Sequence, residues 1–234
     1  YDITTATGTF TATGMTQHNC FSINASKLVM DGRGWGTLPS TPPHRVSSYI
    51  NSLNETVHQL SNHTAGAIAA GSFFLDIAHI IIYREKHTLS DLREHGEYWK
   101  LIEGSMQCFV HSMNSLSRNA VESPFTNVSV FDRPKLRALT NDENMGWYFQ
   151  QEDAIDGIPI NAIEDCQKLG MKWEDYVVEL IMELQHIHLG IMNNGDPLHN
   201  HRPITFPVTS VNASVAKNDK GENYFEEPEF VDDI

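Results

Sequence analysis

Residues 125–131 alternate between apolar and small polar side chains, which is the pattern of a β-strand in the middle of the chain. The apolar positions are Phe125, Val128, Val130 and Phe131, and the polar positions are Thr126, Asn127 and Ser129. Pro134 follows shortly afterwards, and because proline cannot continue a ladder, the strand is expected to end by Asp132. The polar content fits either a strand that faces a polar cavity or an edge strand with one wet face, and the pattern alone leaves both open.

Apolar residues recur every three to four positions in three longer segments, which predicts amphipathic helices. The first begins near His44 and runs to about residue 60, and the second covers 89–115 behind the capping box Thr88-Leu-Ser-Asp91. The third covers 161–192 and ends at Asn193-Asn-Gly195, which tolerates the left-handed conformation typical of a helix end. A short helical piece is expected near 144–151, and further strands are expected within 15–30 and 203–212.

Strands that alternate with long helices predict an α/β fold, with parallel strands that the helices cover. The apolar run at 65–83 approaches membrane-spanning length, but Asp76 and His79 lie inside it, and ionisable groups are costly in lipid. The run is therefore interpreted as a buried segment of a soluble protein, and its periodicity does not decide between helix and strand. The glycine-rich stretch 31–36 lacks a strand and helix around it and is interpreted as a turn rather than a phosphate cradle.

Composition divides the chain into three expected parts. Residues 1–14 form an extension rich in Thr, Ala and Gly, and residues 15–216 form the main body. Residues 217–234 form an acidic tail, which we interpret as an exposed loop or a partner-binding segment.

The chain has 234 residues, of which 40% are hydrophobic, and its formal net charge is −14. This charge argues against a surface for polymeric nucleic acid, which needs a basic face, whereas a single nucleotide needs only a few local donors. The three cysteines, Cys20, Cys108 and Cys166, lack paired metal-ligand spacing and predict reduced thiols in the cytoplasm. Cys108 falls within a predicted helix, where a small buried residue is the expected role.

Twelve histidines raise the question of a metal site. His186 and His188 lie two positions apart on a predicted helix and point to different faces, so one is expected to be packed and the other exposed. His199 and His201 follow in a predicted loop, but the sequence lacks the clustered Cys and His pairs of structural zinc sites. No metal site is therefore predicted in this sequence.

Three stretches, taken together and in order, point to a family. They are Met15-Thr-Gln-His-Asn-Cys-Phe-Ser-Ile-Asn24, Ser123-Pro-Phe-Thr-Asn-Val-Ser129 and Thr205-Phe-Pro-Val-Thr-Ser-Val-Asn212. Each resembles a strand of the catalytic barrel in the anaerobic (class III) ribonucleoside-triphosphate reductases, which are glycyl-radical enzymes. The resemblance runs from about residue 14 to about residue 212 and implies half of a ten-stranded α/β barrel. An open half-barrel exposes strand edges, so a partner or a dimer is expected.

The resemblance assigns the catalytic role to Cys20, although by its residue type alone Cys20 would be interpreted as a small buried side chain. In the family, a thiyl radical on a second cysteine removes the 3′ hydrogen of the ribonucleotide. The thiol that matches Cys20 then donates hydrogen as the 2′ hydroxyl leaves as water, which requires a neutral thiol close to the sugar in a water-poor cavity. His18 and Asn19 are candidates to orient the sugar or the thiol, and Ser123 and Asn127 are candidates for substrate contact.

Several parts of the family's machinery have no match in these residues: the radical-bearing cysteine, the glycyl-radical loop and the four-cysteine zinc site. The resemblance therefore implies an N-terminal portion of the enzyme, split or truncated, that works only with a C-terminal portion carrying the glycyl radical and the zinc. Ribonucleotide substrates, nucleotide effectors and a radical-SAM activating enzyme are further expected partners, and formate or a thiol protein is the expected reductant. The alternative is a non-catalytic module for nucleotide binding or dimerisation on the same scaffold.

Overall fold

The computed structural model of the chain describes residues 9–12, 15–18, 21–34, 39–64, 66–116, 121–141, 148–149, 157–196 and 200–232. The chain divides into two compact units, each assembled from three stretches of sequence. Unit 1 comprises Tyr1–Phe73, Gly104–Ser129 and Asn194–Ser210. Unit 2 comprises Phe74–Glu103, Val130–Asn193 and Val211–Ile234.

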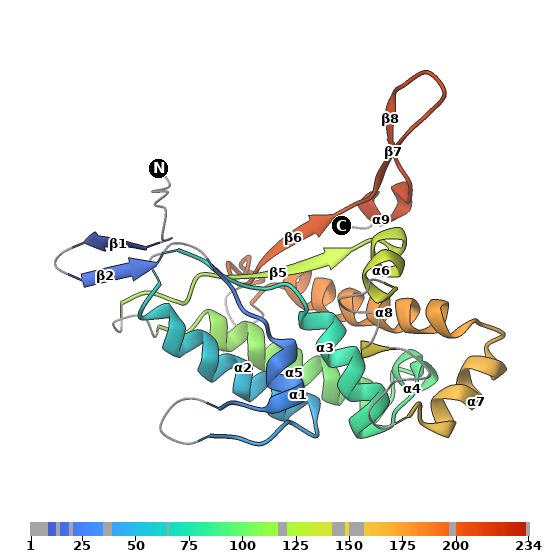
Figure 1. Cartoon of the computed structure of the whole chain (residues 1–234), viewed down its shortest axis with the longest axis horizontal. Coiled ribbons are helices and arrows are strands. Elements are labelled where there is room, and N and C mark those ends of the chain that lie inside the picture. Colours follow the sequence, from blue (N-terminus) through green and yellow to red (C-terminus); the bar gives the residue numbers. More distant parts are fainter. Residues whose placement is uncertain are drawn as a thin grey trace. The chain divides into compact units, whose positions relative to one another are not determined.

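Helices and short strands alternate along the chain, as the sequence predicts for an α/β protein (Figure 1). The described elements are, in order, β1 (Thr9–Ala12), β2 (Met15–His18), β3 (Phe21–Ser22), α1 (Ser26–Asp31), α2 (Val46–Ser61), β4 (Ile68–Ala70), α3 (Phe73–His79), the π-helix η1 (Ile80–Glu85), α4 (Leu89–Arg93), α5 (Glu97–Met113), β5 (Thr126–Phe131), α6 (Arg133–Thr140), α7 (Ile160–Lys168), α8 (Trp173–Asn194), β6 (Val208–Asn212), β7 (Val215–Lys217), β8 (Asn223–Phe225) and α9 (Pro228–Asp232). The helix expected near 144–151 falls mostly outside the described residues.

The main sheet has four strands in the order β3-β4-β5-β6. Both β3 with β4 and β4 with β5 pair in parallel, which confirms the predicted parallel arrangement. Strand β5 therefore has a neighbour on each side, and the interpretation of residues 125–131 as an edge strand is wrong. A separate antiparallel pair, β1 with β2, precedes the sheet, so part of the N-terminal extension forms a strand.

Burial alternates along β5 as a strand with one covered face requires. Thr126, Val128 and Val130 are buried, whereas Asn127 and Ser129 are half-buried. Thr126 is polar in type but belongs to the buried set, because side chains two positions apart share a face, whereas the apolar Phe125 is exposed.

The core of unit 1 is aromatic. Phe73 stacks on Phe109 with ring centroids 4.7 Å apart, and Tyr49 of α2 lies 6.4 Å from the Phe73 ring. The Nε2 atom of His58 on α2 lies 2.8 Å from Ser112 Oγ on α5, so a polar contact accompanies the rings. Helix α2 also contacts β4, which confirms that the predicted helix packs through its apolar stripe.

Two of the predicted long helices are broken. The segment expected at 89–115 divides into α4 and α5, and between them His95 adopts a left-handed conformation with φ of 51°. The segment expected at 161–192 divides into α7 and α8 near Gly170, whose φ is 65°. A left-handed residue ends a helix. In both segments the spacing of apolar residues continues beyond that residue, which is why the sequence predicted one helix in place of two. The capping box at Thr88 and Asp91 and the stop at Gly195, with φ of 64°, are confirmed.

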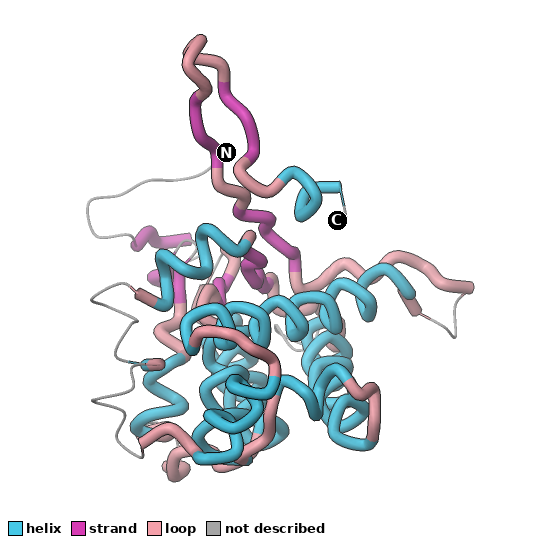
Figure 2. Tube along the Cα trace, turned by 90° about the vertical axis from the view of Figure 1, so that its right-hand side faces the viewer, coloured by secondary structure: helices cyan, strands magenta, loops and turns pink. Residues whose placement is uncertain are grey.

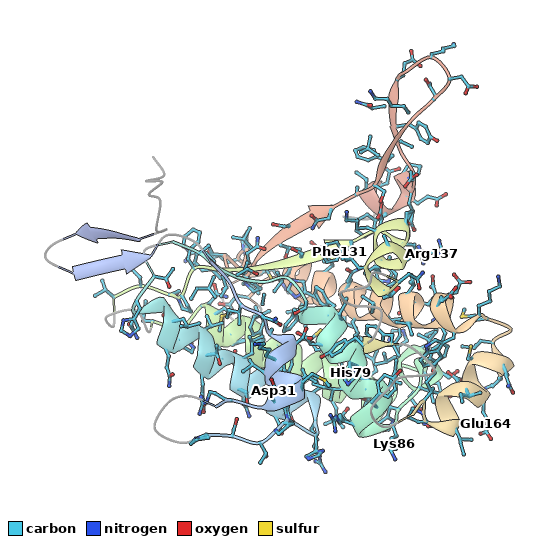
Figure 3. The ribbon with its side chains drawn as sticks, viewed as in Figure 1. Asp31, His79, Lys86, Phe131, Arg137 and Glu164 are labelled. Atoms are coloured by element: carbon cyan, nitrogen blue, oxygen red, sulfur yellow. The ribbon has the colours of Figure 1, made fainter. Side chains whose placement is uncertain are left out.

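The apolar run at 65–83 holds both a strand and a helix, namely β4, α3 and the start of η1. In unit 2, Asp76 and His79 are buried on α3, where Figure 3 labels His79. The Tyr148 hydroxyl donates to Asp76 Oδ1 at 3.0 Å, and His79 Nδ1 lies 3.0 Å from the Tyr148 carbonyl oxygen. Such bonds allow polar groups to lie inside an apolar segment. Among the described helices, none has the length and hydropathy of a membrane span.

Asp132 holds three segments of unit 2 together. It is fully buried, and its Oδ1 accepts from Lys135 N at 3.0 Å, which caps the N-terminus of α6. Its carboxylate also accepts from the backbone N–H of Ser214 and from Ser214 Oγ, the latter at 2.9 Å. Its own backbone N–H donates to the Asn212 carbonyl oxygen at 3.3 Å. Asp132 therefore links the end of β5 to the segment that leads into β7.

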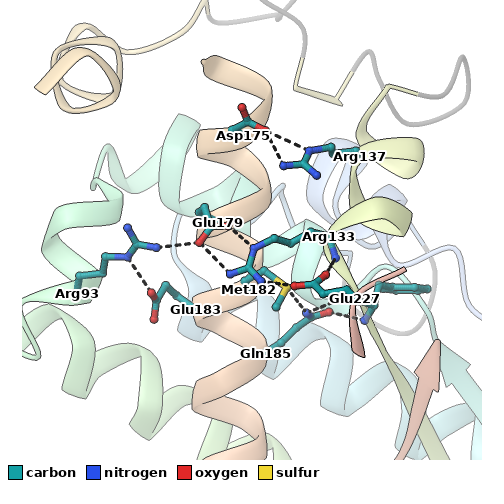
Figure 4. Close-up of polar contacts among 10 residues, drawn as sticks. Arg93, Arg133, Arg137, Asp175, Glu179, Met182, Glu183, Gln185 and Glu227 are labelled. Carbon is teal, nitrogen blue, oxygen red and sulfur yellow. Dashed lines mark hydrogen bonds and ion pairs between the residues drawn. The ribbon is translucent and has the colours of Figure 1, made fainter. Parts of the chain in front are cut away.

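Arg133 links α6 to α8 and to the tail in unit 2 (Figure 4). Its guanidinium pairs with Glu179, with Nε 2.5 Å from Oε1, and with Glu227, which also accepts from the Arg133 backbone N–H at 2.8 Å. Arg93 adds ion pairs with Glu179 at 3.0 Å and Glu183 at 2.8 Å. Burial alone would raise the pKa of Glu179, but the hydrogen bonds and charges of the two arginines outweigh burial and hold the pKa below its usual value.

The acidic tail is not a plain loop. Strands β7 and β8 form an antiparallel hairpin, with Val215 opposite Phe225, that extends away from α6 and α8 of the same unit (Figures 1 and 2). Helix α9 follows, and its Phe230 is buried. Tyr224 and Phe225 remain about half exposed, at 51% and 47%.

Loss of the Asp132 carboxylate is expected to destabilise unit 2. Asp132→Ala removes a helix cap and leaves the Ser214 donors without their acceptor, so the free energy of unfolding should fall by roughly 2–4 kcal/mol. Asp219→Ala, at an exposed position in the hairpin turn, is the matched control and should change it little. Urea unfolding followed by circular dichroism measures both, and an unchanged transition midpoint in Asp132→Ala would contradict this anchoring role.

Candidate functional site

A row of small and polar side chains crosses the half-buried face of the sheet in unit 1. The register places Ser22 of β3 beside Ala69 of β4, and Ala69 beside Asn127 of β5. Ser22 is exposed, and the other two are half-buried. Neighbouring residues in register share a face, and the opposite face carries the buried positions Ile68, Ala70 and Thr126. The sheet is therefore covered on one face and accessible on the other.

Strand β6 extends this row. The side-chain Nδ2 of Asn127 donates to Ser210 Oγ at 2.6 Å, and Ser210 is also half-buried. The two residues lie 83 positions apart in the sequence, and the sheet brings them together. Ser22, Ala69 and Ser210 carry small side chains, so the row is a surface of small and polar groups on which a small molecule could lie.

The predicted site residues are described to different extents. Asn127 is placed with a defined side-chain hydrogen bond, and Ser123 lies half-buried just before β5. His18 ends β2 opposite Thr9, and only its backbone is described. Asn19 and Cys20 lie outside the described residues, directly before β3 in the sequence. Their roles therefore remain predictions.

Sequence reasoning missed Ser210. It lies in the stretch at 205–212 that matched a family strand, but its neighbours Thr209 and Val211 gave no reason to select it. The alternation of side chains along β5 and β6 could have identified Ser210. If the two strands are neighbours, a hydroxyl on the same face as Asn127 lies within reach of its amide.

Two small cavities lie away from this row. One, in unit 2, has a volume of about 210 Å³ and includes Arg133, Gln185 and Phe230 in its lining. The other, in unit 1, has a volume of about 150 Å³ and includes Asn114 and Arg202. Enclosed small-molecule sites commonly measure about 300–1,000 Å³, so neither cavity alone would enclose a nucleotide.

Comparison with models of known protein families shows to which family the chain belongs. The family model described as anaerobic ribonucleoside-triphosphate reductase matches residues 10–230. The chain belongs to the anaerobic ribonucleoside-triphosphate reductase family. The resemblance seen in three strand-like stretches is thereby confirmed over nearly the whole sequence. A search of curated proteins gave no match.

Solved reductases share the fold. The Thermotoga maritima anaerobic ribonucleotide reductase in complex with dATP and CTP is 21% identical with a TM-score of 0.63, and the match covers 92% of this chain and 30% of that one. The same enzyme with glycerol in the active site is 23% identical with a TM-score of 0.61, covering 93% and 31%. Another anaerobic ribonucleotide reductase is 22% identical with a TM-score of 0.62, covering 93% and 29%. This member of the family thus spans about 30% of the length of the solved reductases.

The cysteines of this reductase-family chain differ in burial. Cys108 is exposed, and the prediction that it is buried is wrong, because it lies two positions from buried Met106 and Val110 and so points to the opposite side of α5. Cys166 is buried, and its Sγ lies 3.1 Å from the Met171 carbonyl oxygen. Burial, and then the charge of Asp165, raise the pKa of the Cys166 thiol, so this thiol stays protonated at neutral pH.

The described histidines of this family member differ in burial and do not gather into a metal site. His188 is fully buried against Phe74, whereas His186 is exposed, which confirms the expected pair. His201 Nδ1 lies 2.6 Å from the Asn194 carbonyl oxygen, and His199 lies outside the described residues. Within the described part of the chain, no three His, Cys, Asp or Glu side chains gather as metal ligands.

His188 makes the stability of the folded chain depend on pH. Burial lowers the pKa of His188 from 6.5 to about 4, so the unfolded chain takes up a proton at a higher pH than the folded chain does. Its contribution to stability is therefore complete above pH 6.5 and is lost as pH falls to about 4, by about 3 kcal/mol in total. Urea unfolding at pH 7.5, 6, 5 and 4 measures this slope.

Two variants assign the slope to His188. His188→Gln should flatten it, whereas His186→Gln, on the same helix but exposed, should keep it. Burial also lowers the pKa of His58, so a smaller slope of the same sign should remain in His188→Gln. Equal slopes in the two variants would show that His188 is not the group that titrates.

Proposed function

We propose that this chain forms the N-terminal portion of the catalytic barrel of an anaerobic ribonucleotide reductase. The whole enzyme would convert ribonucleoside triphosphates to deoxyribonucleotides by radical chemistry in the cytoplasm. The observation that carries this proposal is the sheet of unit 1, which is buried on one face and bears the polar row Ser22, Ala69, Asn127 and Ser210 on the other. The family match over residues 10–230 supplies the reaction class.

A half-barrel accounts for this one-sided sheet. Parallel sheets are normally covered on both faces, and here the face opposite the buried one is only half-buried and polar. In a closed ten-stranded barrel, that face would line the interior, and the apolar face would carry the helices. A C-terminal portion would supply the remaining strands and cover the open strand edges. The match to about 30% of the solved reductases supports a portion of this size.

Cys20 is the proposed catalytic residue. It directly precedes β3 in the sequence, and Ser22, two positions later, lies on the polar row. A second cysteine, in the C-terminal portion, would remove the 3′ hydrogen of the ribonucleotide, and the Cys20 thiol would donate a hydrogen atom as the 2′ hydroxyl leaves as water. Formate or a thiol protein would return the electrons. The polar row would hold the sugar at a fixed distance from the thiol, which is the main requirement for hydrogen transfer.

The remaining components are proposed to lie outside this chain. The glycyl radical and the zinc would belong to the C-terminal portion, and a radical-SAM enzyme would activate the complex. The solved Thermotoga maritima reductase binds dATP and CTP, which supports nucleotide effectors and substrates for the assembled enzyme. Without the C-terminal portion, this chain would bind nucleotide but would not turn it over.

Reconstitution tests the proposal. The chain is expressed anaerobically with the C-terminal portion of the reductase and an activating enzyme, and deoxyribonucleotide formation from CTP is measured. We expect turnover with the wild-type chain, background levels with Cys20→Ala, and near wild-type turnover with the matched control Cys108→Ala, because Cys108 is exposed. Nucleotide binding should survive Cys20→Ala, since the thiol is proposed to react rather than to bind.

Two outcomes would contradict the proposal. Undiminished turnover in the Cys20→Ala complex would remove Cys20 from the reaction. Assembly and nucleotide binding without turnover by the wild-type complex would favour the alternative, a non-catalytic nucleotide-binding and dimerisation module.

A further inference from the structure

The hydrogen bond between Asn127 and Ser210 holds the Asn127 amide in place on the accessible face of the sheet. Nδ2 of Asn127 donates to Ser210 Oγ at 2.6 Å. A side-chain amide has a donor end and an acceptor end, and here the donor end is turned to Ser210, so the acceptor end Oδ1 is turned away from it. Within the described part of the chain, no donor reaches the Asn127 carbonyl oxygen Oδ1. An acceptor on a half-buried polar surface is therefore available for a ligand.

The neighbouring position in the row carries a small side chain. Ala69 lies beside Asn127 in the row and carries only a methyl group, and exposed Ser22 follows it on β3. A ligand over Ala69 would thus meet the Asn127 amide on one side and the Ser22 hydroxyl on the other. Both groups can accept a hydrogen bond, and neither carries a charge.

The chemistry of Asn127 Oδ1 selects a hydroxyl-bearing part of the ligand. Phosphate oxygens are acceptors only and find no partner in a carbonyl oxygen, whereas a sugar hydroxyl can donate to Asn127 Oδ1. We propose that Ser210 is a positioning residue that holds the Asn127 amide so that Oδ1 accepts from the ribose 2′ hydroxyl of the substrate. This inference rests on the proposed function, and it adds a residue and a recognition rule to the site. Ser210 acts through Asn127 and need not touch the nucleotide.

A purely structural role makes a different prediction. If the bond between Asn127 and Ser210 serves only to join β5 to β6, its loss would lower stability and leave ligand discrimination unchanged. If it orients the amide, its loss would weaken binding of ribonucleotides more than binding of their 2′-deoxy counterparts. The ratio of the two affinities therefore separates the roles, because a loss of folded protein affects both ligands equally.

The test uses the reconstituted reductase, with the kinetics of CTP reduction and inhibition by dCTP as readouts. In Ser210→Ala, the KM for CTP should rise about tenfold with kcat within about threefold of wild type, and the inhibition constant of dCTP should change less than the KM. Ser210→Thr keeps a hydroxyl and should restore the wild-type KM. Ser48→Ala, at an exposed position of α2, is the matched control for loss of a serine hydroxyl.

A double variant tests whether Ser210 acts through Asn127. Asn127→Ala with Ser210→Ala should have a KM no higher than that of Asn127→Ala alone, because Ser210 is proposed to act on the substrate through Asn127. Additive increases in KM would show that Ser210 contacts the substrate by itself and would overturn the positioning role.

The outcomes for this inference and for the proposed function are separate. Turnover by the wild-type complex together with an unchanged KM in Ser210→Ala would overturn the inference and leave the proposed function standing. Equal losses of affinity for CTP and dCTP would also overturn it, in favour of strand joining or of contacts to the base. A wild-type complex without turnover would overturn both.

Discussion

Strand β4 is only three residues long, yet its backbone pairs with β3 on one side and with β5 on the other. This parallel pairing fixes the register of the whole row, because side chains in register lie at a spacing that the backbone sets. The buried positions Ile68 and Ala70 hold the strand against the helices of unit 1. Ala69, between them, is consequently directed to the polar face. The position of Asn127 relative to Ser22 thus depends on the burial of two apolar side chains, Ile68 and Ala70.

Local chemistry made much of the fold predictable. The capping box at Thr88, the helix stop at Gly195 and the apolar stripe of α2 each depend on neighbours within one or two turns, and all three are found. The breaks at His95 and Gly170 were not predicted, because the apolar period continues on both sides of each break. Cys108 was misassigned because residue type was used to predict its burial, whereas helix phase decides it.

The candidate site was predictable only in part, because its residues lie far apart in the sequence. Asn127 could be selected because it lies in a strand of unusual composition. Its partner Ser210 lies 83 positions away, and only the order of strands in the sheet brings β6 beside β5. Family resemblance supplied the roles of Cys20, His18 and Asn19, which residue type alone would not have given. A polar site on a parallel sheet is built from strands that the chain reaches at long intervals, so no local pattern contains it.

The turn between β7 and β8 is closed by its own hydrogen bonds. Asn218 Oδ1 accepts from the backbone N–H groups of Lys220 and Glu222 at 2.9 and 3.0 Å, and its Nδ2 donates to the Glu222 carboxylate at 2.8 Å. The stem of the hairpin is fixed separately, because Glu226 N donates to the Ser214 carbonyl oxygen at 3.0 Å. The turn and the base of the hairpin are therefore held by separate hydrogen bonds, and a change in the turn leaves the bond at the base in place. A short peptide epitope or a fluorescent label inserted between Asp219 and Lys220 would break the Asn218 bonds of the turn but leave the bond between Glu226 and Ser214 in the stem, and it would mark the protein for imaging or purification.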